Sequence, residues 1–210
     1  MPPAPHPVFL HQRQVFAHRL ERHFAAGSHV LGLGTGDPQD ALALARLGVR
    51  LLVLEPDPGR IEAARSEATG PGSGPVQFEV GGAGALQGAG RLFDGAYSSP
   101  GALEDSQWTA LAPALARSLN AGAPVVLALG RPAARVRRLL GHDFLWKTRF
   151  ALGVVLRRSV SGDWAARNPQ TFGLLAILER IVRAWPVIRT LGEYTVWEGA
   201  RIRRVGDSRH

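Results

Sequence analysis

Short apolar segments alternate with segments of helical periodicity along the first 130 residues of this 210-residue chain. Five of the apolar segments have the length and the β-branched and leucine content of buried strands, at 30–33, 49–54, 76–80, 93–97 and 125–129. Helical periodicity occurs at 11–24, before the first strand, and then between strands at 40–47, 61–69 and 108–119. This alternation predicts an α/β fold, in which a doubly wound and mainly parallel sheet is covered by helices on both faces.

The last third of the chain follows a different pattern. An amphipathic helix is expected at 172–185 and a final strand at 194–202. The stretch 143–168 matches neither periodicity. We therefore expect one domain with a helical insert after the fifth strand. Its parts are an N-terminal helical cap (1–28), a core (29–130), an insert or substrate region (131–190) and a final strand with a tail (191–210).

The whole chain has a formal net charge of +8, and the positive charge is concentrated in its C-terminal part. Residues 1–130 hold nine arginines against eleven carboxylates, whereas residues 131–210 hold sixteen basic residues against six carboxylates. One interpretation is an anionic partner, such as RNA or an acidic substrate. The other interpretation is that the positive charge reflects composition alone, because a ratio of 24 arginines to one lysine is typical of a GC-rich coding bias.

Several classes of site are disfavoured by composition. The chain has no cysteine, which excludes disulfides, thiolate metal sites and a cysteine nucleophile. No segment has the pattern of a signal peptide or the length of a membrane span, so a cytoplasmic location is expected. The seven histidines show no metal-binding spacing, and no metal site is expected. His11 and His18 share one helix face, where they either line a site entrance or belong to an ordinary helix surface.

A glycine turn and an acidic residue indicate a nucleoside ligand. Gly34, Thr35 and Gly36 stand where the first strand turns into a helix, and glycines there allow a ligand close to the backbone. Glu55 closes the second strand, nineteen residues after Gly36, where a carboxylate can accept hydrogen bonds from both ribose hydroxyls. The two features together favour a cofactor that contains adenosine.

These segments resemble the class I S-adenosylmethionine-dependent methyltransferases. The resemblance covers roughly residues 15–129 and rests on four segments: VLGLGTG at 30–36, LALARLGVRLLVLE at 42–55, LFDGAYSS at 92–99 and NAGAPVVLALGR at 120–131. It implies a Rossmann-like seven-stranded sheet and S-adenosylmethionine as the cofactor. The cofactor-binding residues that it implies are Gly34, Thr35, Gly36, Glu55, Pro56, Ala83, Leu86 and Ser98.

Three positions depart from the family pattern. Gly32 and Gly82 stand where the family has acidic residues, and Pro38 stands where it has a third glycine. Asp37 or Asp40, at the start of the next helix, can replace the lost contacts by turning toward the ligand's amino group. The alternative is that both are acids favoured by the helix dipole alone.

The resemblance implies methyl transfer to an unidentified, small organic acceptor, with Tyr97, Ser99 and Glu104 as catalytic candidates. Aromatic residues expected to wall the acceptor pocket favour a small or lipid-like molecule over nucleic acid, namely Phe144, Trp146, Phe150, Trp164 and Phe172. The alternative for these residues is that they form the core of the insert. The alternative is a non-catalytic binding protein with the same fold, whose basic C-terminal third binds an anionic partner. A nicotinamide dehydrogenase is disfavoured, because Gln39 replaces the third glycine of its fingerprint.

Overall fold

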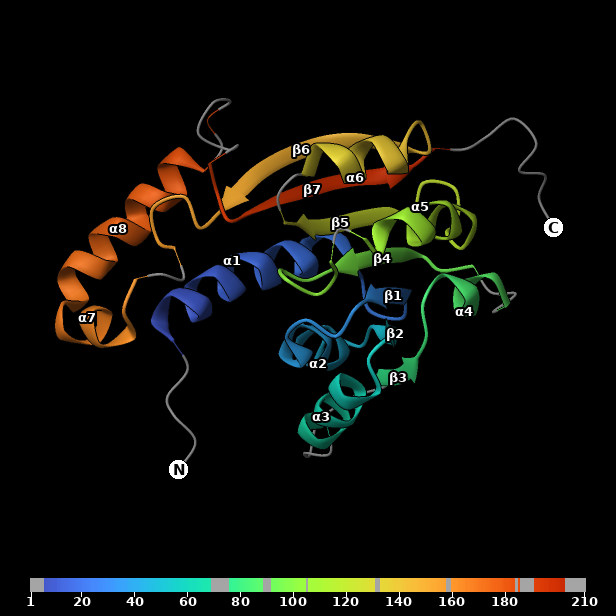
Figure 1. The fold of residues 1–210 in the computed structure, drawn as a ribbon, viewed down its shortest axis with the longest axis horizontal. Helices are drawn as coiled ribbons and strands as arrows, with labels where there is room; N and C mark the ends of the chain where they lie inside the picture. The colour runs from blue at the N-terminus through green and yellow to red at the C-terminus, as the bar shows by residue number, and fades with distance from the viewer. Residues whose placement is uncertain are drawn as a thin grey trace.

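A seven-stranded sheet forms the centre of the computed structural model, with the strand order β3-β2-β1-β4-β5-β7-β6 (Figure 1). The five strands that the sequence predicts are parallel, whereas β7 runs antiparallel to both of its neighbours. The doubly wound, mainly parallel fold class is therefore confirmed. The strands are β1 (His29–Leu33), β2 (Arg50–Glu55), β3 (Val76–Val80), β4 (Gly95–Ser98), β5 (Pro124–Leu129), β6 (Phe144–Leu152) and β7 (Tyr194–Arg201).

The structure describes most, but not all, of the chain. The described residues are 6–68, 76–88, 92–104, 106–130, 133–157, 160–183, 185 and 191–202. Thr69, the expected end of one helix, and the tail at 203–210 lie outside them.

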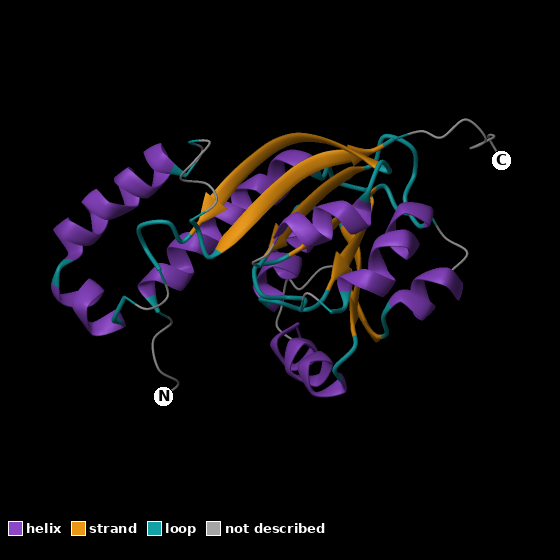
Figure 2. Ribbon diagram, turned by 45° about the horizontal axis from the view of Figure 1, so that its top comes forward, coloured by secondary structure: helices purple, strands orange, loops and turns teal. Residues whose placement is uncertain are grey.

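Helices cover both faces of the sheet (Figure 2). One face packs against α1 (Pro7–His23), α2 (Pro38–Arg46) and α3 (Pro58–Ala68), and the other against α4 (Ala83–Gly88), α5 (Trp108–Arg117) and α6 (Ala133–Leu140). Successive side chains of a strand point to opposite faces. Val30 accordingly packs with Phe16 of α1, while Leu31 packs with Trp108 of α5. The near-continuous apolar strands of the sequence reflect this burial on two sides.

The segment expected to be a helical insert also contributes a strand. β6 pairs with β7 at the edge of the sheet, and the register shifts between Trp146 and Thr148. This irregularity places an extra residue, Lys147, in the strand, so the alternation of side chains changes phase there. For this reason, the strand within 143–168 shows no regular alternation of apolar and polar residues in the sequence. Two helices, α7 (Gly162–Arg167) and α8 (Pro169–Val182), then separate β6 from β7.

The carboxyl ends of β4, β5 and β6 lie at the same end of the sheet, and α7 and α8 stand beyond it (Figure 1). In parallel α/β sheets, ligands bind at this end of the strands. Among the described residues, no helix has the length and apolar character to cross a membrane.

Candidate functional site

The glycine turn lies between β1 and α2, as the sequence predicts. Gly34 and Gly36 have φ angles of +74° and +50°, which an L side chain adopts only with strain. Asp37 then caps α2 by accepting a hydrogen bond from the Gln39 N–H (3.0 Å), and Pro38 takes the first position of the helix. A proline is well suited there, because the first N–H of a helix has no intrahelical partner. Pro38, which stands where the family has a third glycine, thus begins α2 directly after the glycine turn.

Glu55 lies beside this turn and holds it in place. Its Oε2 accepts hydrogen bonds from the Thr35 N–H (2.9 Å) and the Thr35 hydroxyl (2.8 Å), and its Oε1 accepts one from the Asp57 N–H (3.1 Å). Arg60 Nε lies 3.5 Å from Oε2. A carboxylate has about four acceptor positions, so these three hydrogen bonds leave capacity for one more. The main partner of Glu55 is thus Thr35 of the turn, and the ribose contact expected of Glu55 stays a prediction.

The segment that follows β4 packs directly on the glycine turn. A Cβ atom on Gly34 would lie 2.6 Å from the Ala102 carbonyl oxygen, and one on Gly36 would lie 2.6 Å from Ser99 Cβ. The protein's own residues 99–102 therefore occupy the space that the missing side chains of Gly34 and Gly36 leave open.

Tyr97 explains the missing acid at Gly32. A Cβ atom on Gly32 would lie 3.1 Å from the Tyr97 hydroxyl oxygen and 3.0 Å from Val53 Cγ2. The Tyr97 side chain of β4 therefore lies against the position where the family carries an acidic side chain. Burial raises the pKa of the Tyr97 phenol far above its usual value, so it stays neutral. Tyr97 is thus buried against Gly32 and neutral near neutral pH, and its catalytic role stays a prediction.

Asp40 is a buried carboxyl group next to the turn. Its Oδ2 accepts a hydrogen bond from the Ser99 hydroxyl (2.7 Å), and its Oδ1 is buried without a hydrogen-bond partner among the described residues. Burial raises the pKa of Asp40 to about 7, and the charge of Asp37 adds to this. The hydrogen bond from Ser99 and the charge of Arg13 oppose the shift. Asp40 is therefore the more deeply buried of the two candidate acids.

Asp37 has other partners. Arg13 Nε of α1 lies 3.3 Å from Asp37 Oδ2. A small cavity of about 10 Å³, roughly the space of one water molecule, lies between α1 and this region. Its lining residues are Phe9, Gln12, Arg13, Asp37, Asp40 and Pro100. Both acids therefore line one cavity, and each has a buried oxygen without a hydrogen-bond partner among the described residues, Oδ2 in Asp37 and Oδ1 in Asp40.

The remaining predicted cofactor-binding and catalytic residues differ in burial. Ser98 is fully buried, and its hydroxyl has no hydrogen-bond partner in the described part of the chain. Leu86 of α4 is buried in the core and Ala83 packs against that core, whereas Pro56 is exposed. Glu104 is also exposed, and its backbone N–H donates to Gln107 Oε1 before α5.

The aromatic residues expected to wall an acceptor pocket are mostly structural. Phe144 and Phe150 are buried in the cores on the two faces of the sheet, which favours a core role over a place at a pocket wall for these two residues. Trp146 packs against Phe144 and Trp197. The Phe172 ring contacts the ring of His11, with 6.4 Å between the ring centroids.

Comparison with solved structures identifies the fold. A TehB-like S-adenosylmethionine-dependent methyltransferase from Corynebacterium glutamicum matches with a TM-score of 0.57 and 16% identity, over 88% of this chain and 86% of that one. A putative sarcosine dimethylglycine methyltransferase from Galdieria sulphuraria matches with a TM-score of 0.64 and 13% identity, over 93% and 86%. The chain has the class I methyltransferase fold.

The fold leaves the reaction open. The [4+2]-cyclase SpnF also matches, with a TM-score of 0.63 and 15% identity over 92% of this chain and 82% of that one. No family model matches the chain, and no curated protein does. The fold alone therefore does not define the function of this chain, which depends on its own residues.

Proposed function

We propose that the chain binds S-adenosylmethionine at the glycine turn and transfers its methyl group to a small organic acceptor. The observation that carries this proposal is the Asp40 carboxyl, which is buried beside the turn with one oxygen unpartnered. An unpartnered carboxyl oxygen in a buried site is costly, and a cationic ligand group offsets that cost. S-adenosylmethionine carries both an ammonium and a sulfonium group.

Each residue of the site has a role under this proposal. Asp40 binds the ligand's ammonium group, and Glu55 uses its remaining acceptor capacity for one ribose hydroxyl. Gly34 and Gly36 allow the ligand to approach the backbone once residues 99–102 move outward. When bound, S-adenosylmethionine supplies an electrophilic methyl group, and the protein's task is to orient the acceptor in line with it.

A second candidate function has its own supporting observation. Residues 99–102 fill the space next to Gly34 and Gly36, which favours a non-catalytic binding protein that retains the fold without the cofactor. The two candidates differ in whether S-adenosylmethionine binds at all.

Titration calorimetry with S-adenosylmethionine and S-adenosylhomocysteine separates them. A dissociation constant below roughly 100 μM, about −5.5 kcal/mol, is expected for the unaltered chain. Glu55→Gln should weaken binding by about 10- to 150-fold, the equivalent of one charge-assisted hydrogen bond. Glu79→Gln, at an exposed position of β3, is the matched control and should bind normally. Absence of heat at millimolar ligand would contradict the methyltransferase proposal and support the second candidate.

A further inference from the structure

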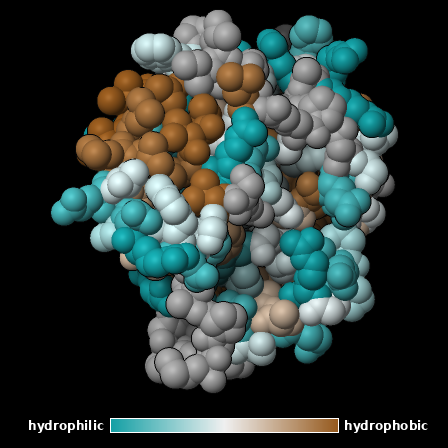
Figure 3. All heavy atoms as spheres, turned by 60° about the vertical axis from the view of Figure 1, so that its left-hand side comes forward, coloured by the Kyte–Doolittle hydropathy of each residue, from teal (hydrophilic) through white to brown (hydrophobic). Residues whose placement is uncertain are grey.

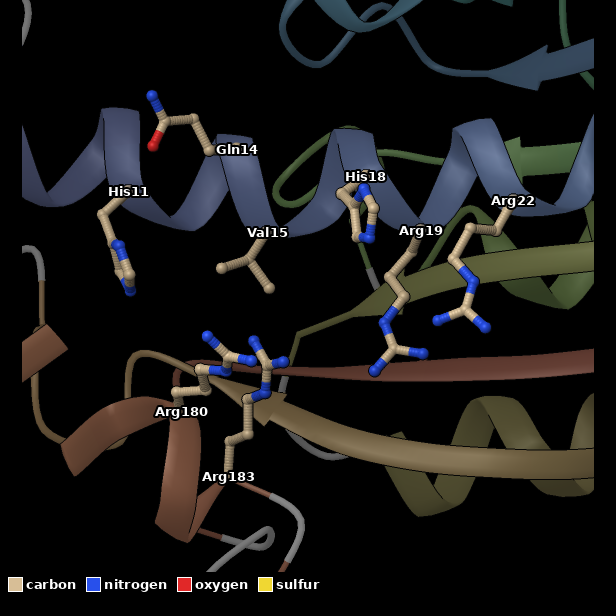
Figure 4. A pocket seen from close by; sticks show the side chains of 8 residues that line it. All are labelled: His11, Gln14, Val15, His18, Arg19, Arg22, Arg180 and Arg183. Carbon is tan, nitrogen blue, oxygen red and sulfur yellow. The ribbon is translucent and has the colours of Figure 1, made fainter. Parts of the chain in front are cut away.

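A basic cavity of about 510 Å³ lies between α1 and α8 (Figure 4). This volume is within the range of about 300–1,000 Å³ that is typical of small-molecule sites. The basic residues that line the cavity are His11, His18, Arg19 and Arg22 of α1, Arg180 of α8, and Arg183, which directly follows α8. The cavity therefore has the size of a metabolite site and a lining that favours an anion.

The arginine side chains from both ends of this lining point into the same space. The guanidinium groups of Arg180 and Arg183 lie side by side and point toward α1 (Figure 4). Those of Arg19 and Arg22 extend from α1 into the space between the two helices (Figure 4). A ligand has to enter the cavity to contact all four groups.

The two sides of α8 differ in character. Its outward side carries large exposed apolar residues, which form the hydrophobic area in Figure 3, namely Leu174, Ile177, Leu178 and Ile181. Glu179 is buried and accepts hydrogen bonds from three consecutive backbone N–H groups at 154–156 (3.0, 2.6 and 3.2 Å). Because these bonds fix the orientation of α8, Arg180 and Arg183 are held toward α1.

Phe150 of β6 positions two of the four arginines. Its ring is buried, and the guanidinium carbons of Arg19 and Arg183 lie 4.8 Å and 5.4 Å from its centroid. Both arginines are half-buried, whereas Arg22 and Arg180 are exposed. A guanidinium group that stacks on a ring keeps N–H donors for a ligand, and its fixed position reduces the entropy lost on binding. The inner part of the cavity is thus arranged before a ligand enters.

Positive charge in the cavity exceeds the negative charge near it. Among the described residues, no carboxylate lines the cavity, and Glu198 of β7 lies 3.6 Å from Arg19 Nη1. Arg22, Arg180 and Arg183 form no ion pair with a described residue. Burial lowers the pKa of Arg183, and the charges of Arg19 and Arg180 lower it further, which two nearby carboxylates offset only in part. An anion in the cavity would relieve this repulsion.

We propose that this cavity binds a compact small molecule that carries two or more phosphate groups. A guanidinium group binds phosphate through two parallel N–H···O bonds. One phosphate group offers about three acceptor oxygens, which is too few for four guanidinium groups that bind in this way. In the described part of the chain, no Phe, Tyr or Trp side chain lines the cavity, so a nucleobase has no ring to stack on. A compact polyphosphate therefore fits better than a nucleotide or a nucleic acid.

Titration calorimetry with the 210-residue chain tests the proposal. The probes are tripolyphosphate, whose phosphate groups are linked, fructose 1,6-bisphosphate, whose phosphate groups are separated, and sulfate. We expect one site per chain for at least one phosphate probe. Its affinity should be about tenfold higher than that of sulfate, or more, because a second anionic group adds at least one charge-assisted hydrogen bond. The tighter phosphate probe shows which spacing of the groups the cavity prefers.

Arg180→Gln removes one guanidinium group from an exposed position and should weaken the tighter probe about tenfold. Arg180→Lys keeps the charge without the planar fork, so it should restore only part of the affinity. The matched control is Arg46→Gln, which removes the same charge at the exposed end of α2 and should bind as the unaltered chain does. Thermal unfolding should confirm that every variant is folded.

The proposal is overturned if neither phosphate probe at millimolar concentration gives heat or raises the melting temperature, or if sulfate binds as tightly as they do. It is also overturned if Arg46→Gln weakens binding as much as Arg180→Gln, because binding then depends on net charge alone. The small cavity beside Asp40 lies on the other side of α1, and no step here needs S-adenosylmethionine. This proposal and the proposed function can therefore fail independently.

Discussion

Replacing Asp40 by asparagine should remove a large pH dependence of stability. The pKa of Asp40 is about 7 in the folded chain, against an ordinary value of 3.8. The folded state therefore holds this proton more tightly, and the free energy of unfolding falls as pH rises from about 4 to about 7. The full loss is about 4 kcal/mol, because one pKa unit corresponds to about 1.4 kcal/mol. Asparagine cannot ionise, so the Asp40→Asn variant lacks this loss.

Urea unfolding of both proteins at pH 5 and pH 8 measures the effect. Relative to the variant, the unaltered chain should lose about 3 kcal/mol between these two pH values. Any cost of the asparagine amide inside the protein is present at both pH values and cancels in this comparison. Glu62→Gln, an exposed position of α3, is the control and should follow the unaltered chain. Parallel pH profiles for Asp40→Asn and the unaltered chain would refute the reasoning.

Three further changes test the surrounding structure. Gly34→Ala places a Cβ 2.6 Å from the Ala102 carbonyl at a positive φ, so we expect destabilisation of about 2 kcal/mol or more and a melting temperature lower by about 4–8 °C. Glu179→Gln should cost about 3 kcal/mol in urea unfolding, because one charged acceptor of the N–H groups at 154–156 is lost. Burial opposes the ionisation of Glu198, but the hydrogen bond from His23 and the nearby basic charges outweigh it and lower its pKa. Glu198 therefore stabilises the fold above pH 4.5, and Glu198→Gln should reduce the loss of stability that urea unfolding detects as pH falls below that value.

The periodicity of the sequence was sufficient for most of the fold. The parallel strands are buried on both faces, so each appears as a short apolar run that a helix pattern separates from the next. β6 was the exception, because the irregularity at Trp146 and Thr148 interrupts its alternation and its place at the sheet edge exposes part of it. A bulge is set by pairing with β7, which sequence periodicity does not record.

The candidate site was predictable only where its residues follow one another in the pattern of strand and turn. Glu55 and the glycine turn are such a case, since each ends a neighbouring parallel strand. The pairing of Ser99 with Asp40 joins residues 59 positions apart, and no local pattern indicates it. The fit of Tyr97 against Gly32 likewise depends on two strands lying side by side.

The α1 helix connects the two sites of this chain. Gln12 and Arg13 line the small cavity beside Asp40, whereas His11 and Arg22 line the basic cavity beside α8. Because successive residues of a helix point about 100° apart, one helix can serve both cavities with different side chains. A change at Arg22 leaves the ion pair of Arg13 with Asp37 intact, so the two cavities can be perturbed separately.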